Sequence, residues 1–172
     1  MEQQTINLIA QKIKDGDTGI IPTDTIYGIV CSAFNKDSVE KIYKIKKRNK
    51  NKPMIILIGL VDDLKLFNIN TKIDSWPERT SIILDCNDFD YLHRGKRSLA
   101  FRLPHNNDLI DILKISGPIV ASSANIEGNE PVENIEEAKK YFGDKINFYL
   151  DGGTIKSKPS KIINIKNEII RE

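Results

Sequence analysis

Short apolar runs alternate along this chain with segments whose apolar residues recur at helical spacing. These patterns predict helices over residues 5–14, 36–47, 108–115 and 132–141, and strands over residues 18–22, 54–58, 81–84, 98–102, 118–121, 147–150 and 161–165. The run 54–58 is apolar at every position, which is typical of a strand that is covered on both faces. Interleaved helices and apolar strands predict an α/β fold around one mixed sheet.

The size of the chain fits one domain. Its 172 residues are enough to bury a core without a disulfide or a metal staple. No repeat and no Pro/Gly/Ser-rich stretch divides the sequence, so we expect a single domain over residues 1–172. The net charge is only +2, so contacts with phosphate or nucleic acid must come from a local patch.

Several classes of protein are excluded by what the sequence lacks. Cys31 and Cys86 have no second Cys or His at metal spacing, so no zinc site and no other metal site is predicted, and both are expected to be reduced, buried thiols. The longest purely apolar run is far shorter than a membrane span, and the N-terminus does not resemble a secretory signal. We therefore expect a cytoplasmic protein with no membrane contact.

Residues 22–28, with the sequence PTDTIYG, form the first segment whose side chains could bind a ligand or take part in a reaction. Two hydroxyls, a carboxylate and a phenol lie between a proline and a glycine, directly after a predicted strand. Such a loop suits hydrogen bonding to a small polar ligand. An ordinary turn in which Thr and Asp side chains cap backbone amides explains the same pattern equally well.

Residues 44–52, KIKKRNKNK, form a basic run in which six of nine residues are Lys or Arg. A solvated helix face is the common explanation for such a run. Here, however, Val39, Ile42 and Tyr43 define the apolar stripe of the helix, and Lys46 falls on that stripe. A lysine there must either extend to solvent or meet an anion. Arg48 follows at the helix end and could bind phosphate or carboxylate beside it.

Two further segments follow apolar strands. Arg102 ends the run SLAFR just before Leu103-Pro104 and suits an anion clamp, although a strand-end arginine that reaches solvent is the simpler reading. Residues 122–125, SSAN, place small hydroxyls and one amide after another buried strand, which suits either a ligand or an ordinary helix cap. No glycine pattern of a P-loop or of a dinucleotide-binding fold is present, and nothing supports a Ser-His-Asp triad.

Taken in order, these segments resemble the YrdC-like family, the threonylcarbamoyl-AMP synthases of the minimal, single-domain TsaC type. The matching segments are PTDTIYG at 22–28, Lys46-Lys47-Arg48, Lys52-Pro53-Met54, WPERT at 76–80, Arg102-Leu103-Pro104, Ser123-Ala124-Asn125 and PSKII at 159–163. The resemblance extends from residue 5 to about residue 165. It implies a twisted α/β sheet with a large concave, basic surface.

The resemblance also implies a reaction. L-threonine, bicarbonate and ATP would give threonylcarbamoyl-AMP and pyrophosphate, which makes the chain a nucleotidyltransferase. Mg²⁺ is the expected companion of ATP. The product would serve the threonylcarbamoylation of an adenosine next to the tRNA anticodon, carried out with downstream transfer proteins. Direct tRNA binding stays open.

The resemblance assigns roles to individual residues. By this assignment the catalytic residues, which also bind ATP, are Lys46, Arg48, Ser123 and Asn125, and Ser160 is a further ATP contact. The threonine-binding residues would be Thr23, Thr25, Tyr27, Lys52 and Arg102. No covalent nucleophile is needed, because positioning and charge stabilisation suffice for adenylation.

The sequence departs from the family pattern at Glu78-Arg79, where Gly-Pro is usual, at Lys161, where Thr is usual, and at Val132. These departures put the shape of the 76–80 loop and one hydroxyl ligand in question. Two alternatives follow. One is a non-catalytic module that binds tRNA or double-stranded RNA; the other is a carbamoyl-adenylate enzyme with another acceptor, like the related domain of hydrogenase maturation proteins.

Overall fold

The computed structural model describes residues 1–166 and 168–171. The helices are α1 (Gln3–Lys14), α2 (Lys36–Lys46), α3 (Asp90–His93), α4 (Asn107–Ser116) and α5 (Ile135–Phe142), with short 3₁₀ turns η1 (Val61–Phe67) and η2 (Gly143–Lys145). The strands are β1 (Gly19–Pro22), β2 (Tyr27–Ser32), β3 (Ile55–Leu57), β4 (Thr80–Asp85), β5 (Ser98–Arg102), β6 (Ile119–Ser123), β7 (Phe148–Tyr149), β8 (Lys161–Asn164) and β9 (Ile169–Arg171).

The described strands form one sheet in the order β7-β1-β2-β6-β3-β5-β4-β8-β9. The pairs β1/β7, β3/β5 and β4/β8 are parallel, and the other neighbours are antiparallel. The predicted mixed α/β sheet is therefore confirmed. No described helix is long and apolar enough to cross a membrane.

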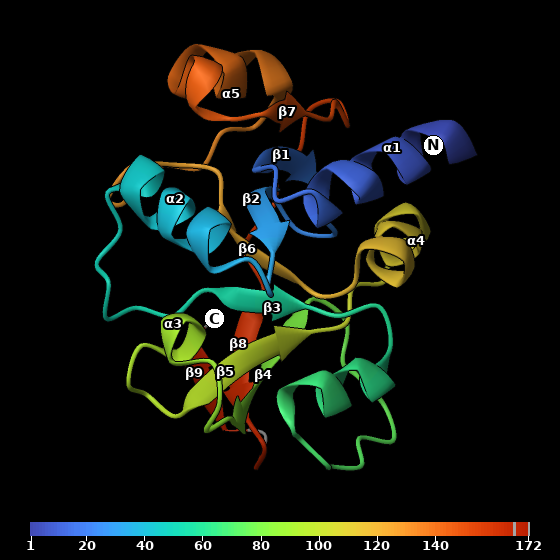
Figure 1. Cartoon of the computed structure of the whole chain (residues 1–172), viewed down its shortest axis with the longest axis vertical. Coiled ribbons are helices and arrows are strands. Elements are labelled where there is room, and N and C mark those ends of the chain that lie inside the picture. The colour runs from blue at the N-terminus through green and yellow to red at the C-terminus, as the bar shows by residue number, and fades with distance from the viewer. Residues whose placement is uncertain (167, 172) are drawn as a thin grey trace.

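Helices cover both faces of the β1–β2 half of the sheet. Helices α1 and α4 lie together on one side, and α2 lies on the other (Figure 1). Neighbouring residues of β1 show why the strands are apolar throughout: Ile20 packs in the core that includes α2, while Ile21 packs in the core that includes α1 and α4. Successive side chains of a strand point to opposite faces, so both faces need apolar residues here. Cys31 and Cys86 are free and buried, as predicted.

Local contacts set both ends of helix α2. The Asn35 side chain accepts a hydrogen bond from the Ser38 amide, which caps the first turn. Lys47 adopts a left-handed conformation with φ 50° and ends the helix one residue earlier than predicted. Arg48 therefore lies in the loop that follows, where its side chain can turn toward the sheet.

Several elements differ from the predictions. The predicted helix 132–141 begins only at Ile135, because the Val132 amide is used in a bond to Ala124 O and Asn134 caps the helix. Strand β2 was not predicted; it forms because the turn after β1 brings Tyr27 opposite Pro22. Helix α3, η1 and β9 were also not predicted, because such short elements carry little periodic signal.

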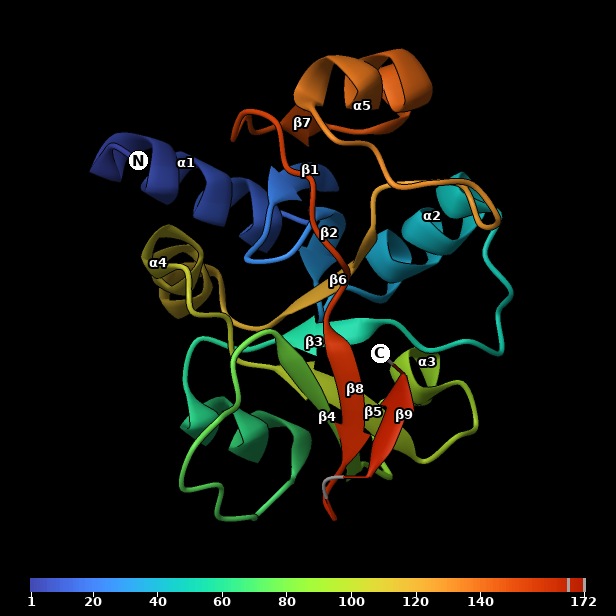
Figure 2. The ribbon, with the colours of Figure 1, turned by 180° about the vertical axis from the view of Figure 1, so that it is seen from behind.

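A strap without helix or strand, residues 151–160, connects β7 to β8. Figure 2 shows it running from the α5 end of the molecule past β1 and β6 to β8. Tyr27 Oη holds it by accepting from Gly152 N at 2.8 Å and donating to Gly153 O at 2.8 Å. A side chain at Gly152 would collide with Pro22, its Cβ lying 2.6 Å from the proline ring, so glycine permits this close approach.

Candidate active site

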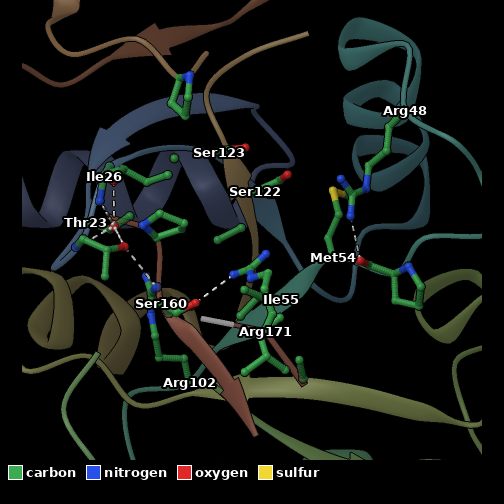
Figure 3. A pocket seen from close by; sticks show the side chains of 18 residues that line it. Thr23, Ile26, Arg48, Met54, Ile55, Arg102, Ser122, Ser123, Ser160 and Arg171 are labelled. Carbon is green, nitrogen blue, oxygen red and sulfur yellow. Dashed lines mark hydrogen bonds between the residues drawn. The ribbon is translucent and has the colours of Figure 1, made fainter. Parts of the chain in front are cut away.

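A pocket of about 260 Å³ opens between distant parts of the sheet (Figure 3). Its walls come from the β1–β2 turn, from β3, β5 and β6, and from the hairpin β8–β9. Strands β8 and β9 stand at the opposite end of the strand order from β1 and β2. The sheet must therefore curl strongly for both ends to face one pocket, which agrees with the twisted sheet that was expected.

The β1–β2 turn is rigid because its own side chains tie it together. Thr23 Oγ1 donates to Ile26 O at 2.7 Å and lies 3.1 Å from Thr25 Oγ1. The same oxygen accepts from the amides of Thr25 and Ile26. The capping explanation of this segment is thus correct, and it coexists with the ligand explanation, since Thr23 and Thr25 both line the pocket.

Arg102 points into the pocket and not to solvent; only 4% of it is exposed. Its Nη1 donates to Thr25 Oγ1 at 3.1 Å, and its Nη2 lies 3.0 Å from Asp24 Oδ1. Burial lowers the pKa of Arg102, whereas the charge of Asp24 opposes this effect. The reading of Arg102 as a solvent-reaching arginine is wrong, because β5 delivers it to the middle of the curled sheet.

Arg48 and Arg171 complete a set of three arginines around the pocket (Figure 3). Arg48 Nη2 donates to Pro53 O at 2.9 Å, and Arg171 Nη2 donates to Ser160 O at 2.9 Å. Burial and the nearby charge of Arg48 lower the pKa of Arg171. Sequence reasoning missed Arg171, although it follows two apolar residues, Ile169 and Ile170, much as Arg102 ends the run SLAFR.

Lys46 lies on the core side of α2, as the helical register predicted, with 1% exposure. It does not extend to solvent, and it forms no ion pair with any described residue. Its Nζ instead donates to the backbone oxygens of Ser123 and Asn125, the latter at 2.7 Å, and to Asn125 Oδ1 at 3.0 Å. These neutral oxygens take the place of water around the Lys46 ammonium, because the loop after β6 covers the C-terminal end of α2. Burial and the charge of Arg48 lower the pKa of Lys46 to about 7.

The loop after β6 is held from both sides. Ser123 lines the pocket, and its Oγ donates to Asn125 Oδ1 at 2.6 Å. Asn125 Nδ2 donates to Asn129 O at 2.6 Å, which turns this side chain away from the pocket lining. Ser160, the last residue of the strap before β8, also lines the pocket, and its Oγ lies 3.0 Å from Ser81 Oγ.

Two residues assigned to threonine do not line the pocket in this structure. Tyr27 is fully buried, and its hydroxyl binds the strap. Lys52 is exposed and forms an ion pair with Glu127, with 2.7 Å between Lys52 Nζ and Glu127 Oε1. The Asn49 amide also donates to Glu127, and these two contacts lower the pKa of Glu127. Glu127 thereby fastens the Arg48 loop to the loop after β6.

The chemistry of the pocket is that of an anion site. Its lining combines three guanidinium groups with the hydroxyls of Thr23, Thr25, Ser122, Ser123 and Ser160, and it contains no carboxylate among the described residues. Guanidinium groups bind phosphate and carboxylate through paired N–H donors. The fold and the site together define a class: an α/β protein whose curled mixed sheet encloses a pocket suited to an anionic small molecule.

Comparison with known sequences names the family within that class. The family model Sua5/YciO/YrdC, described as "Telomere recombination", matches residues 11–172. The chain belongs to this family, which confirms the resemblance drawn from the motifs.

Known members agree with this assignment. The threonylcarbamoyl-AMP synthase of Acinetobacter baumannii is 28% identical over 187 residues, covering 94% of this chain and 95% of that protein. The structure of Sua5 from P. abyssi complexed with L-threonine is 25% identical with a TM-score of 0.87, covering 96% of this chain. This chain spans about half the length of that Sua5, 52%. E. coli YciO, 20% identical with a TM-score of 0.85 over 99% of this chain and 90% of its own, shares the fold.

Proposed function

We propose that this chain is a threonylcarbamoyl-AMP synthase that forms threonylcarbamoyl-AMP and pyrophosphate from L-threonine, bicarbonate and ATP. The observation that carries the proposal is the pocket lined by three arginines and several hydroxyls, without a carboxylate among the described residues. Both the triphosphate of ATP and the carboxylate of threonine require such cationic donors. Further support comes from the names of the curated relatives, such as the A. baumannii protein.

The reaction has two steps, each of which is a substitution. The threonine amine attacks the carbon of bicarbonate, the C–OH bond breaks, and the hydroxide leaves as water with a proton from the amine, which gives a carbamate. A carbamate oxygen then attacks the α-phosphorus of ATP, and the bond to pyrophosphate breaks. The protein contributes position and positive charge, without a covalent step.

Roles follow from the contacts. Arg102, fixed by Asp24 and Thr25, would hold the threonine carboxylate, and Thr23 would bind the same substrate. Arg48 and Arg171 would bind the phosphates and stabilise the negative charge of the leaving pyrophosphate.

The serines and Lys46 would complete the nucleotide side of the pocket. Ser123 and Ser160 would donate their hydroxyls to phosphate oxygens. The contacts of Lys46 favour a positioning role, since its ammonium holds the loop that carries Ser123 and Asn125.

Mg²⁺ does not fit a resident site of this chain. The described residues contain no group of three or more His, Cys, Asp or Glu side chains arranged around one point, and the described pocket lining offers no carboxylate. Mg²⁺ prefers carboxylate and phosphate oxygens, so it would arrive with the phosphates of ATP.

The remaining proposals concern context. We propose that the whole chain, 1–172, forms a single domain and acts in the cytoplasm. Its product would serve the modification of tRNA next to the anticodon, with transfer proteins as partners. The RNA-binding alternative loses support from the basic run. Within that run Lys46 is buried, Arg48 lines the pocket and Lys52 is paired with Glu127.

The experiment measures pyrophosphate release from ATP with and without L-threonine and bicarbonate. The proposal requires release that depends on both. Arg48→Ala should abolish it, while Lys50→Ala, which removes the same charge from an exposed position in the same loop, should leave it unchanged. Release without threonine would indicate another acceptor. No release, combined with RNA binding that weakens steeply with salt, would favour the RNA module.

A further inference from the structure

A second hollow, which we call the Arg79 hollow, adjoins the pocket. It is open, measures about 840 Å³, and is lined by Glu78, Arg79, Ser157, Lys158, Pro159 and Lys161. Pro159 also lines the central pocket, so the two spaces are neighbours across one residue of the strap. Glu78, Arg79 and Lys161 are three of the four positions at which the sequence departs from the motifs of its family; the fourth, Val132, lies elsewhere.

Pairing between strands β4 and β8 brings the residues at these departing positions together. Strand β8 lies parallel to β4 (Figure 2), and the Lys161 amide donates to Arg79 O at 3.0 Å. Two neighbouring residues then have separate roles: Ser160, which precedes β8, is buried and lines the central pocket, while Lys161, the first residue of β8, is exposed and lines the hollow. Lysine at position 161 therefore adds charge to the hollow and not to the central pocket.

Arg79 is held in an unusual conformation. Its φ is 51°, a region that residues other than Gly, Asn and Asp rarely adopt and that the ring of proline forbids. The loop at 76–80 thus has a shape that the usual Gly-Pro sequence could not give at this position. Arg79 Nη2 donates to Ser157 Oγ and, at 3.2 Å, to Lys158 O, so the guanidinium is fixed against the strap.

The charge of the hollow is not neutralised. Within residues 1–166 and 168–171, neither Arg79 nor Lys158 nor Lys161 forms an ion pair, and Glu78 is the single carboxylate of the lining. Arg79 is also near enough to Arg102 for its charge to lower the pKa of that group. Positive charge therefore continues from the central pocket into the hollow.

We propose that the Arg79 hollow is a second anion site, which binds a small phosphate anion of the pyrophosphate type through Arg79, Lys158 and Lys161. Three cations from two chain segments suit an anion with more than one phosphate group better than a single carboxylate. The site itself does not depend on the proposed function. Only the source of its ligand does, since pyrophosphate released in the central pocket would form next to this hollow.

Calorimetric titration with inorganic pyrophosphate tests the site. The unaltered chain should bind at two sites, one of which Arg48→Ala removes. The double variant Lys158→Gln/Lys161→Thr should lose the other, with at least tenfold weaker binding there, and should keep the site that Arg48→Ala removes. Both lysines are exposed, so the fold should persist, and a thermal melt checks this. The matched control is Lys139→Gln/Lys145→Thr, which changes two exposed lysines on α5 and η2 and should retain both sites.

Three results would overturn the proposal. The double variant could bind pyrophosphate like the unaltered chain, or the control could lose as much affinity as the double variant. Alternatively, a duplex RNA could require Lys158 and Lys161 while pyrophosphate does not, which would make the hollow a nucleic-acid contact. If ATP turnover fails but the lysine-dependent site remains, the proposed function is wrong and the second anion site stands.

Discussion

The ion pair between Asp24 and Arg102 allows a quantitative test of how the site is built. Their side chains are 7% and 5% exposed, with 3.0 Å between the charged groups. Within the described residues neither Asp24 oxygen nor Arg102 Nε has a further hydrogen-bond partner. Asp24→Asn keeps the shape but leaves the arginine charge buried without compensation. Removing one partner of a buried pair costs about 3–5 kcal/mol.

This loss of stability can be measured as a change in melting temperature or in the free energy of unfolding. In a chain of this length each kcal/mol shifts Tm by roughly 2–4 °C, so Asp24→Asn should lower Tm by roughly 6–20 °C. Urea denaturation gives the free energy of unfolding directly. The double variant Asp24→Asn/Arg102→Met removes both charges and should be more stable than Asp24→Asn alone. Asp62→Asn is the matched control: its pair with Lys65 is exposed, and its loss should cost less than about 1 kcal/mol.

Two outcomes would refute this reasoning. A loss below about 1 kcal/mol in Asp24→Asn would mean that the pair is not desolvated as the burial indicates. A double variant less stable than the single variant would mean that Arg102 stabilises the fold by packing and not through its charge. Threonine binding should fall in both variants, because Arg102 is displaced or absent.

Three other predictions concern the surroundings of the pocket. Folding lowers the pKa of Lys46 from 10.5 to about 7, so the unfolded chain binds the extra proton between these values and stability rises with pH there. Between pH 7 and pH 9 the free energy of unfolding, measured by urea denaturation, should rise by about 2–3 kcal/mol more in the unaltered chain than in Lys46→Met. An equal rise in both chains would contradict the lowered pKa of Lys46. Tyr27→Phe removes the hydroxyl that binds the strap and should cost about 1–3 kcal/mol, with faster amide exchange at Gly152; unchanged exchange there would speak against this anchor. Arg171→Gln should weaken ATP binding by about tenfold in calorimetry while the exposed Lys166→Gln should not, and equal affinities would remove Arg171 from the site.

Much of the fold was accessible from the sequence because its elements are long or strongly patterned. The helices around residues 5–14 and 36–47 and the strand 98–102 match α1, α2 and β5 closely. Periodicity also placed Lys46 on the buried face of its helix, since that depends only on helical geometry. Strand β9 was missed because three residues cannot display a period, although they carry Arg171.

The sequence by itself determined which residues are available: the hydroxyl-rich turn at 22–28, the basic run at 44–52, and the arginine that ends SLAFR. Only the tertiary structure decided which of these meet. The curl of the sheet brings Arg171 from its far end to Arg48 and Arg102, while Lys46 is drawn beneath the loop after β6 and Lys52 turns outward to Glu127. The physical reason is that charge and hydrogen-bonding type are local properties of a residue. The partner that satisfies them is set by strand pairing between residues that are distant in sequence.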